Sequence, residues 1–352
     1  MITNVIGLMS GSSLDGIDMV DVDFYHDDRW HFEIKAFDNI SYDEQWKETL
    51  SQGFYYGKER LAKTDLEYGI MLGEETKHFI ERNNLRPDII ASHGHTIFHR
   101  PDLGYTLQIG SGQAIADICN CITINDFRSE DVEKGGQGAP LVPMGDKLLF
   151  SEYALCLNIG GIANISYDNN EGIRIAYDIC IANQALNYLS RQKGLNYDEC
   201  GFMARKGNIN IELLNSLNDN DYYKNKNPKS LGREFFESVT LPIFNDYNIS
   251  TEDKLATFVE HIAIQTGEAA KGCDKGKMLI SGGGAKNTFL VERIKKNTGH
   301  EVIIPAENII DYKEALVFAF LGLLRKESKI NILSSVTGAK SDSSSGKIWF
   351  PK

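Results

Sequence analysis

The sequence predicts an α/β protein that is built from two similar halves. Near residue 5, and again near residue 154, an apolar run enters a glycine-rich turn and leaves as a second apolar stretch, so each half opens with strand, turn and strand. Other apolar runs lead into polar turns and into stretches of helical period. The 352 residues are enough for two domains with substantial cores.

Composition narrows the functional classes. The chain has 37 Lys and Arg against 49 Asp and Glu, and a net charge of −12 argues against nucleic acid or an anionic membrane as the main partner. No run approaches about 18 apolar residues, and the N-terminus has a strand pattern rather than a leader pattern, so we expect a cytoplasmic protein. The six scattered cysteines are expected to be reduced and buried.

The first glycine-rich turn, Ser10 to Gly16, has the composition of an anion site. Its glycines let backbone N–H groups approach a ligand closely, and Ser12 and Ser13 add hydroxyl donors. Asp15 is a candidate ligand for a divalent cation, directly or through water. The alternative is a plain tight hairpin in which Gly and Ser only supply turn geometry, and the turn alone leaves both interpretations open.

The second turn, Asn158 to Asn164, repeats this layout. Two such turns, facing each other over a cleft, would hold a polyphosphate from both sides. Neither turn is followed by the Gly-Lys-Ser/Thr of a P-loop, and neither opens a helix as a dinucleotide-binding turn must. The two commonest nucleotide loops are therefore excluded.

The rest of the first half is expected to alternate between strands and helices. A third strand is predicted at 31–37 and a helical stretch at 41–84. Further strands are predicted within 88–101, 107–110 and 122–131, with a short helix at 113–119 between the last two. The apolar side of the long helical stretch is predicted to enter the core: Leu61, Leu66, Ile70, Met71, Phe79 and Ile80.

Two polar turns follow strands of this half. The first carries His93, His95 and His99, which we interpret as a ligand turn at the end of a strand rather than a zinc site, because no suitable acidic or thiol partner lies nearby. After the next strand, Arg128 either pairs with a neighbouring aspartate or forms a fork that reads a carboxylate or phosphate. The glycine- and proline-rich stretch 135–143 suits an inter-domain hinge or a ligand-covering loop.

In the second half, the strand at 173–178 delivers Asp178. A carboxylate at the end of an apolar strand is poorly solvated, which raises its pKa toward that of a useful base, although a helix-capping role is the alternative. A helix at 184–193 follows, then a surface loop at 214–228 and a helix at 251–271 with a capping hydroxyl before it.

The strand that begins at Lys277 runs into three glycines. These allow close backbone approach to a flat ligand such as adenosine, with a plain turn as the alternative. Helices are predicted at 288–296 and 311–325. Glu314 in the first turn of the last helix either complements the helix dipole or projects into the cleft.

Together these stretches resemble the anhydro-N-acetylmuramic acid kinase family of the actin-like ATPase superfamily. The resemblance covers nearly the whole chain in the family's order, and no single short motif carries it. The matching motifs between Gly7 and Ala339 are GLMSGSSLDGID, SHGHTIFHRP, LQIG, DFRSEDVEKGGQGAPLVP, LNIGGIANIS, KSLGREFF, SGGGAKN and SSVTGA.

The resemblance implies an α/β fold of two actin-like (ribonuclease H-like) domains with a central nucleotide cleft. The first would span 1–132, with 331–352 as a candidate addition, and the second 133–330. It implies ATP and Mg²⁺ as cofactors, and an enzyme that opens the 1,6-anhydro ring of anhydro-N-acetylmuramic acid with water while phosphorylating O6. The product would be N-acetylmuramic acid 6-phosphate, for cell-wall recycling.

The resemblance also assigns residues. Asp178 would be the general base, with Glu314 helping to position sugar or water, and Asp15 would be a metal ligand. Contacts to the sugar are expected from His93, Gly94, Arg128 and Asn183. The residues expected at ATP are Gly11, Ser12, Ser13, Asp15, Gly16, Asn158, Gly160, Gly161, Asn164, Gly282, Gly283, Gly284 and Asn287.

One departure from the family pattern concerns the base. The usual Asp-Thr-Gly-Pro-Gly/Ala-Asn is Asp178-Ile-Cys-Ile-Ala-Asn183 here, which we expect to reshape the wall beside Asp178 and to affect sugar preference. Milder changes are Ser12 for the usual Thr and His95 for the usual Gln. The alternatives are a kinase for another hexosamine and a non-catalytic ATP- and sugar-binding regulator. The expected partners are an amino sugar and ATP, and a homodimer stays open.

Overall fold

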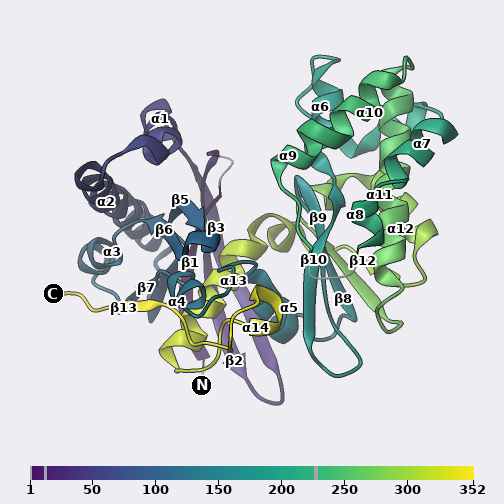
Figure 1. Cartoon of the computed structure of the whole chain (residues 1–352). Coiled ribbons are helices and arrows are strands. Elements are labelled where there is room, and N and C mark those ends of the chain that lie inside the picture. Colours follow the sequence, from purple (N-terminus) through teal and green to yellow (C-terminus); the bar gives the residue numbers. More distant parts are fainter. Residues whose placement is uncertain (1, 12–13, 226–228) are drawn as a thin grey trace. The chain divides into compact units, whose positions relative to one another are not determined.

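The structure is a computed structural model that describes residues 2–11, 14–225 and 229–352. The chain divides into two compact units (Figure 1). The first comprises Met1–Leu149 and Tyr312–Lys352, and the second comprises Phe150–Asp311. The units therefore change over at 149 and 311, whereas the domain boundaries expected from the sequence lie at 132 and 330.

The first unit is built on a six-stranded sheet with the order β13-β7-β4-β1-β2-β3. β1, β2 and β3 form an antiparallel meander, β4 and β7 run parallel to β1, and β13 closes the edge antiparallel to β7. β5 and β6 form a separate antiparallel pair. The strands are β1 (Ile2–Ser10), β2 (Gly16–His26), β3 (Trp30–Ser41), β4 (Ile89–Ser92), β5 (His95–Arg100), β6 (Tyr105–Ile109), β7 (Thr123–Asn125) and β13 (Lys347–Trp349).

The helices of this unit lie between and after these strands. They are α1 (Glu44–Gln52), α2 (Lys58–Asn83), α3 (Gly112–Cys119), α4 (Ser129–Glu133), α5 (Val142–Leu149) and α14 (Ser334–Thr337). α13 (Glu307–Lys326) begins in the second unit and continues into the first. Short 3₁₀ turns occupy Gly53–Tyr55 and Pro101–Leu103.

The predicted helical stretch 41–84 is two helices, and its buried side differs from the prediction. α2 buries Tyr68, Leu72 and Phe79, together with small residues, while Leu66 and Ile70 are exposed. A Cβ on Gly69 would lie 2.6 Å from the backbone nitrogen of Ser111, so the close approach of the chain before α3 requires glycine there. Counting apolar residues alone misses a face that packs through Gly and Thr.

The second unit is built on a five-stranded sheet with the order β10-β9-β8-β11-β12. Again the first three strands form an antiparallel meander, and the next two run parallel to the first. The strands are β8 (Leu155–Ile159), β9 (Ile162–Asp168), β10 (Arg174–Ile181), β11 (Lys277–Ser281) and β12 (Glu301–Ile303). The same strand order in both units confirms the predicted α/β class with two ribonuclease H-like halves.

The helices of the second unit include two in the predicted surface loop 214–228. Leu213, Leu214 and Leu217 of α7 are buried, so the prediction of a loop up to Asn218 was wrong, because three leucines within a polar stretch already supply a helix face. The α-helices are α6 (Asn183–Arg191), α7 (Ile211–Asn218), α8 (Asp221–Lys224), α9 (Arg233–Phe235), α10 (Leu241–Asp246), α11 (Thr251–Ala270) and α12 (Thr288–Asn297). The shorter turns are Glu199–Gly201, Ala204–Lys206, the π-turn Phe236–Thr240 and Gly283–Lys286.

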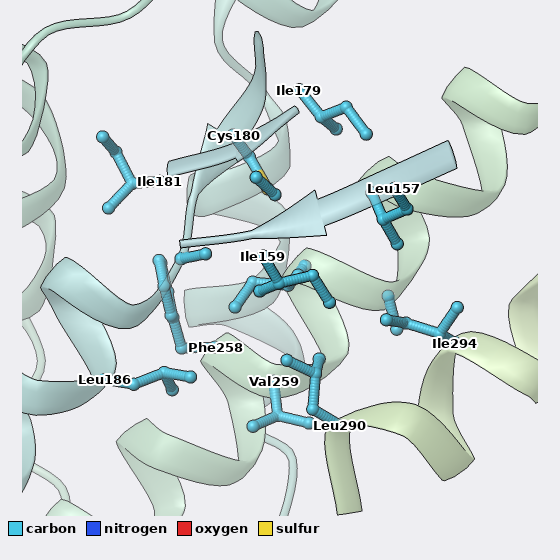
Figure 2. Close-up of a cluster of buried hydrophobic side chains, with 14 of the residues drawn as sticks. Leu157, Ile159, Ile179, Cys180, Ile181, Leu186, Phe258, Val259, Leu290 and Ile294 are labelled. Atoms are coloured by element: carbon cyan, nitrogen blue, oxygen red, sulfur yellow. The ribbon is translucent and has the colours of Figure 1, made fainter. Parts of the chain in front are cut away.

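One face of this sheet packs on α6, α11 and α12. Leu157 and Ile159 of β8 are buried together with Phe258 and Val259 of α11 and with side chains of α12 (Figure 2). Each fully buried side chain of this kind contributes about 1.5–3 kcal/mol. Among the described residues, no helix combines the length and the apolar character that crossing a membrane requires.

Candidate active site

The residues predicted for the site fall into two groups, one in each unit. In the second unit, a row of polar side chains crosses the sheet. Backbone pairing places Ser281 beside Asn158, Asn158 opposite Asn164, and Asn164 opposite Asp178. Directly paired residues carry their side chains on the same face of a sheet. The fold therefore aligns the proposed base Asp178 with Asn158 and Asn164 of the turn predicted for phosphate.

Asp178 is held by contacts on its outer side. Its N–H donates to the carbonyl of Lys229 (3.3 Å), its carbonyl accepts from the Tyr222 hydroxyl (2.6 Å), and its Oδ2 accepts from the Leu231 N–H (2.9 Å). Burial raises the pKa of Asp178 above its ordinary value, and the bond from Leu231 only partly opposes this. A carboxylate with a raised pKa suits the role of a base at neutral pH.

The residues that follow Asp178 are buried. A β-bulge lies between Asp178 and Cys180, which makes Ile179 the extra residue of β10. Ile179, Cys180 and Ile181 are at most 2% exposed and belong to the hydrophobic core (Figure 2). Their side chains supply core volume, and the expected effect of this departure on sugar preference stays a prediction.

The turn between β8 and β9 contacts the start of α6. The Asn183 amide side chain donates to the Ile159 carbonyl (3.1 Å), and its N–H donates to the Gly160 carbonyl (3.1 Å). The N–H of Ala182 donates to the carbonyl of Gly161 (2.8 Å). Asn183 thus fixes the glycine turn that was predicted for phosphate.

The triple-glycine loop lies against the same turn. Gly282 has φ +77°, and a Cβ there would lie 2.6 Å from Asn158 Oδ1. A Cβ on Gly283 would lie 3.7 Å from Asn183 Nδ2, and one on Gly284 would lie only 2.2 Å from Ile159 Cγ2. The structure therefore brings the second glycine turn, predicted for phosphate, and the triple-glycine loop, predicted for adenosine, together at the carboxyl ends of β8 and β11.

Asn287, predicted at the nucleotide, caps a helix. Its Oδ1 accepts from the N–H of Leu290 (3.0 Å) at the start of α12. Beside it, Lys286 pairs with Asp311 at the start of α13 (2.7 Å). The loop between β11 and α12 is therefore anchored at its far end.

In the first unit, a pocket of about 300 Å³ lies beside the ends of β1 and β4. Its lining includes three residues predicted for the site and also two of β5 that were not predicted as site residues. The lining residues are Met9, Ser10, Gly11, His93, Thr96, His99, Arg128 and Ala139. Gly11, expected at ATP, thus shares a pocket with two residues expected at the sugar.

Arg128 and His93 form the polar wall of this pocket. The Arg128 guanidinium donates to His93 Nε2 through Nε (3.1 Å) and Nη2 (2.9 Å), and Nη1 donates to the carbonyl of Gly138. His93 is 5% exposed, and burial, with Arg128 nearby, holds the pKa of His93 well below its usual value. His93 is therefore a neutral hydrogen-bond acceptor, because its Nε2 accepts hydrogen bonds from the Arg128 guanidinium.

A buried carboxylate braces the Arg128 contact. Asp131 Oδ2 accepts from the N–H of Gly138 (2.8 Å), and its Oδ1 accepts from the Thr337 hydroxyl (2.7 Å). Asp126 pairs with Lys347 (2.8 Å). Both neighbouring aspartates thus have other partners, which favours the fork interpretation of Arg128 over a structural salt bridge. The glycine-rich stretch predicted as a hinge or cover is anchored within the first unit.

Glu314 projects from α13 close to Arg128. The Glu314 side chain is exposed. Desolvation by the surrounding protein nevertheless raises the pKa of Glu314. The charge of Arg128 lowers this pKa, and the charge of Asp18 raises it. Lys313, next to it, forms a buried ion pair with Asp146 of α5 (2.6 Å). This pair fixes the part of α13 from which Glu314 projects.

The turn after β1 is only partly described. Ser12 and Ser13 lie outside the described residues. Asp15 is exposed, Gly94 is a buried turn residue with φ +72°, and a Cβ on Gly16 would lie 2.3 Å from the Ile40 carbonyl oxygen. At the base of the turn, Ser10 Oγ bonds His95 Nδ1 (3.0 Å) and the Tyr42 hydroxyl (2.7 Å).

A metal would have few protein ligands here. Among the described residues, no group of three His, Cys, Asp or Glu side chains is arranged to hold a metal ion. Mg²⁺ in nucleotide sites needs only one or two carboxylates, with phosphate oxygens and water completing its shell. An exposed Asp15 beside a glycine turn fits that requirement.

Sequence reasoning missed several residues around the two groups. Thr96 and His99 line the first pocket, and His99 was placed in the predicted ligand turn but was not named as a site residue. Tyr222 lay in the predicted surface loop, and Leu231 contributes only its backbone, which no side-chain pattern reveals. The adjacent tyrosines 222 and 223 in a polar stretch were the available signal for a packed segment.

Comparisons with known proteins match this chain over nearly its whole length. A family model described as Anhydro-N-acetylmuramic acid kinase matches residues 3–351. The anhydro-N-acetylmuramic acid kinase of Mannheimia succiniciproducens is 32% identical, with 99% of this chain and 98% of that protein covered. That of Haemophilus influenzae is 33% identical, with 99% and 97% covered. Component A of the (R)-2-hydroxyglutaryl-CoA dehydratase from Acidaminococcus fermentans is similar in structure with a TM-score of 0.49, at 13% identity and with 91% and 97% covered.

Proposed function

The chain belongs to the anhydro-N-acetylmuramic acid kinase family, and on this premise we propose that it phosphorylates O6 of anhydro-N-acetylmuramic acid with ATP while water opens the 1,6-anhydro ring. The product is N-acetylmuramic acid 6-phosphate, which returns cell-wall sugar to metabolism in the cytoplasm. The full-length family match carries this proposal. The polar row that ends in Asp178 supplies a base of the required kind.

Asp178 acts as the general base. Its carboxylate takes a proton from water, and the water oxygen bonds to the anomeric carbon while the bond from that carbon to O6 breaks. O6 then takes the γ-phosphoryl group and ADP leaves, so no further reactant is needed. Burial raises the pKa of Asp178 above its ordinary value, which makes its carboxylate a stronger base.

The second unit supplies part of the proposed ATP site. The Gly160 N–H closes the turn by donating to the Ile162 carbonyl (3.2 Å), so the proposed donors to phosphate are the Gly161 N–H and the amides of Asn158 and Asn164. Gly282 packs closely on Asn158 and so keeps the triple-glycine loop beside the turn proposed for phosphate, which supports a role for this loop at the adenosine part of ATP. Mg²⁺, for which Asp15 is the proposed carboxylate ligand, would neutralise the charge on the phosphates.

The first unit supplies the proposed sugar contacts around Arg128. Arg128, with its guanidinium anchored on His93 and on Gly138, reads polar groups of the substrate. Glu314 lies close enough to Arg128 for each to influence the other's pKa, and its proposed role is to position a sugar hydroxyl or water.

A single assay tests the function. ATP consumption is measured with anhydro-N-acetylmuramic acid, N-acetylmuramic acid, N-acetylglucosamine and no sugar. We expect turnover with the anhydro sugar, and a product with phosphate on O6. Turnover only on the reducing sugars would instead indicate a different hexosamine kinase, and equal turnover without sugar would indicate a nucleotide-driven regulator.

A further inference from the structure

β10 is an edge strand of the sheet of the second unit, and its outer edge at Asp178 is covered by two short pieces of chain. An edge strand leaves backbone N–H and C=O groups without a neighbouring strand, and buried ones need other partners. Here Lys229 accepts from the Asp178 N–H, and the Tyr222 hydroxyl donates to the Asp178 carbonyl at 2.6 Å. A tyrosine side chain thus takes the place of a strand partner.

Tyr222 is itself fixed by its surroundings. The Lys229 ammonium donates to the Tyr222 carbonyl (3.1 Å) and lies 4.6 Å from the centre of its ring. The ring also packs against Phe235, with centroids 5.5 Å apart. Lys229 therefore contacts Asp178 through its carbonyl and Tyr222 through its ammonium, which closes a ring of interactions around the backbone of Asp178.

The backbone of Asp178 needs such support. The β-bulge directly after it interrupts the regular ladder with β9, and bulges re-aim the side chains beside them. The carboxylate is oriented by the N–H of Leu231 (2.9 Å), two residues beyond Lys229. Burial raises the pKa of Tyr222, so its hydroxyl stays protonated and remains a donor.

We infer that Tyr222 is a positioning residue for the reaction: its hydroxyl, with Lys229 behind it, fixes the bulged backbone of Asp178 so that the carboxylate keeps its aim. This inference rests on the proposed role of Asp178 as base. Without the hydroxyl, the Asp178 carbonyl loses its hydrogen-bond donor, and the carboxylate moves away from its catalytic position. A displacement of about 1 Å at a reacting group costs up to about 10²-fold in rate.

The test compares Tyr222→Phe with Tyr223→Phe. The two tyrosines are adjacent and each uses its hydroxyl, but the Tyr223 hydroxyl bonds His261 Nε2 (3.1 Å) and not Asp178. We expect Tyr222→Phe to lower kcat about 10–100-fold with KM for ATP changed less than about 2-fold. Tyr223→Phe should keep kcat within about 2-fold, and equal losses in both variants would overturn the inference.

A second readout does not depend on turnover. The pKa of the Asp178 carboxyl, followed by carbon-13 NMR titration and assigned with Asp178→Asn, should shift in Tyr222→Phe and stay in place in Tyr223→Phe. If Tyr222→Phe fails to fold, Lys229→Met, which keeps the apolar stem, should produce a smaller loss of the same kind. An unchanged kcat and an unchanged pKa would overturn the inference.

Failure of the inference can be told apart from failure of the proposed function. If Asp178→Asn is inactive while Tyr222→Phe behaves as wild type, only the positioning role falls. If Asp178→Asn keeps its turnover, the role of Asp178 as base falls and takes the positioning role with it.

Discussion

Asn164 of β9 lies directly opposite Asp178 of β10, and the two form a non-hydrogen-bonded pair of the antiparallel ladder, because Asp178 directs its N–H and carbonyl outward to Lys229 and Tyr222. Pairs of this kind have the shorter Cα separation, about 4.5 Å, and their side chains come closest. The proposed base therefore stands beside an amide from the turn predicted for phosphate. Asn164 and Asp178 lie 14 positions apart in the sequence, and the register between β9 and β10 brings them together.

Replacing Asp178 by Asn should remove phosphoryl transfer while ATP binding persists. The amide has nearly the same shape but cannot take a proton, and loss of a general base typically costs about 10²–10⁴-fold in rate. Transfer is measured by ADP release and ATP binding by calorimetry. Asp219→Asn is the matched control, because Asp219 is exposed and pairs only at the surface with Lys224. Near-normal turnover in Asp178→Asn would contradict the assignment.

The rate should fall toward acid pH with a midpoint above the ordinary pKa of an aspartate, about 3.9. Burial raises the folded-state pKa of Asp178, and the base is inactive below that pKa because its carboxylate is protonated. The rate at saturating substrate therefore rises with pH through the raised pKa. A profile of kcat from pH 4 to 8 checks this, and a limb centred at or below the ordinary value would refute it.

Much of the fold follows from sequence pattern. Both hairpins, at β1–β2 and at β8–β9, were predicted because alternation of apolar residues around a glycine-rich turn has few other interpretations. α11 was predicted to within one residue from its apolar spacing and its Ser250 cap. The face of α2 was missed, because Gly69 and Thr64 pack there through small size rather than apolar character.

The site was predictable in its residue types but not in its arrangement. Glycine turns and a strand-end aspartate have local signals, whereas the row from Asn158 to Asp178 depends on register between three strands. The bond from Arg128 to His93 joins residues 35 positions apart, and the Tyr222 bond to Asp178 joins residues 44 apart. Contacts over such distances follow from tertiary packing, which no local pattern encodes.

Arg128→Lys should weaken sugar binding and leave ATP binding unchanged. A lysine cannot bond His93 and Gly138 together, because it lacks the planar fork. Losing one charged hydrogen bond costs about 1.5–3 kcal/mol, so KM for the sugar should rise about 10–150-fold. Arg205→Lys is the control, since Arg205 makes an exposed bidentate pair with Glu292. Equal KM values for Arg128→Lys and wild type would remove Arg128 from the sugar site.

Asp21→Asn should stabilise the protein above pH 6 and much less at pH 4. Burial raises the pKa of Asp21 to about 6, and among described groups its Oδ1 has no hydrogen-bond partner. A carboxyl group whose pKa is raised by folding contributes stability that is fully present below the pKa of the unfolded state. This contribution is lost as the pH rises through the pKa of the folded state. The shift of about two units corresponds to at most about 3 kcal/mol at pH 8. Urea unfolding at pH 4 and pH 8 measures the difference, and an equal effect at both would contradict it.

Gly282→Ala should raise KM for ATP about 10-fold and leave KM for the sugar unchanged, whereas Gly172→Ala should alter neither. Both glycines have positive φ, near +77° and +75°, so alanine costs each about 1–2 kcal/mol of backbone strain. Only at Gly282 does the new Cβ meet a proposed nucleotide residue, 2.6 Å from Asn158 Oδ1, while at Gly172 no described atom lies within 4 Å. Initial rates at varied ATP concentrations give KM, and thermal unfolding midpoints show whether the two variants lose the same stability. Together the two measurements separate crowding at the nucleotide site from a general loss of stability. If both variants raise KM for ATP alike, the triple-glycine loop has no specific part in holding the nucleotide.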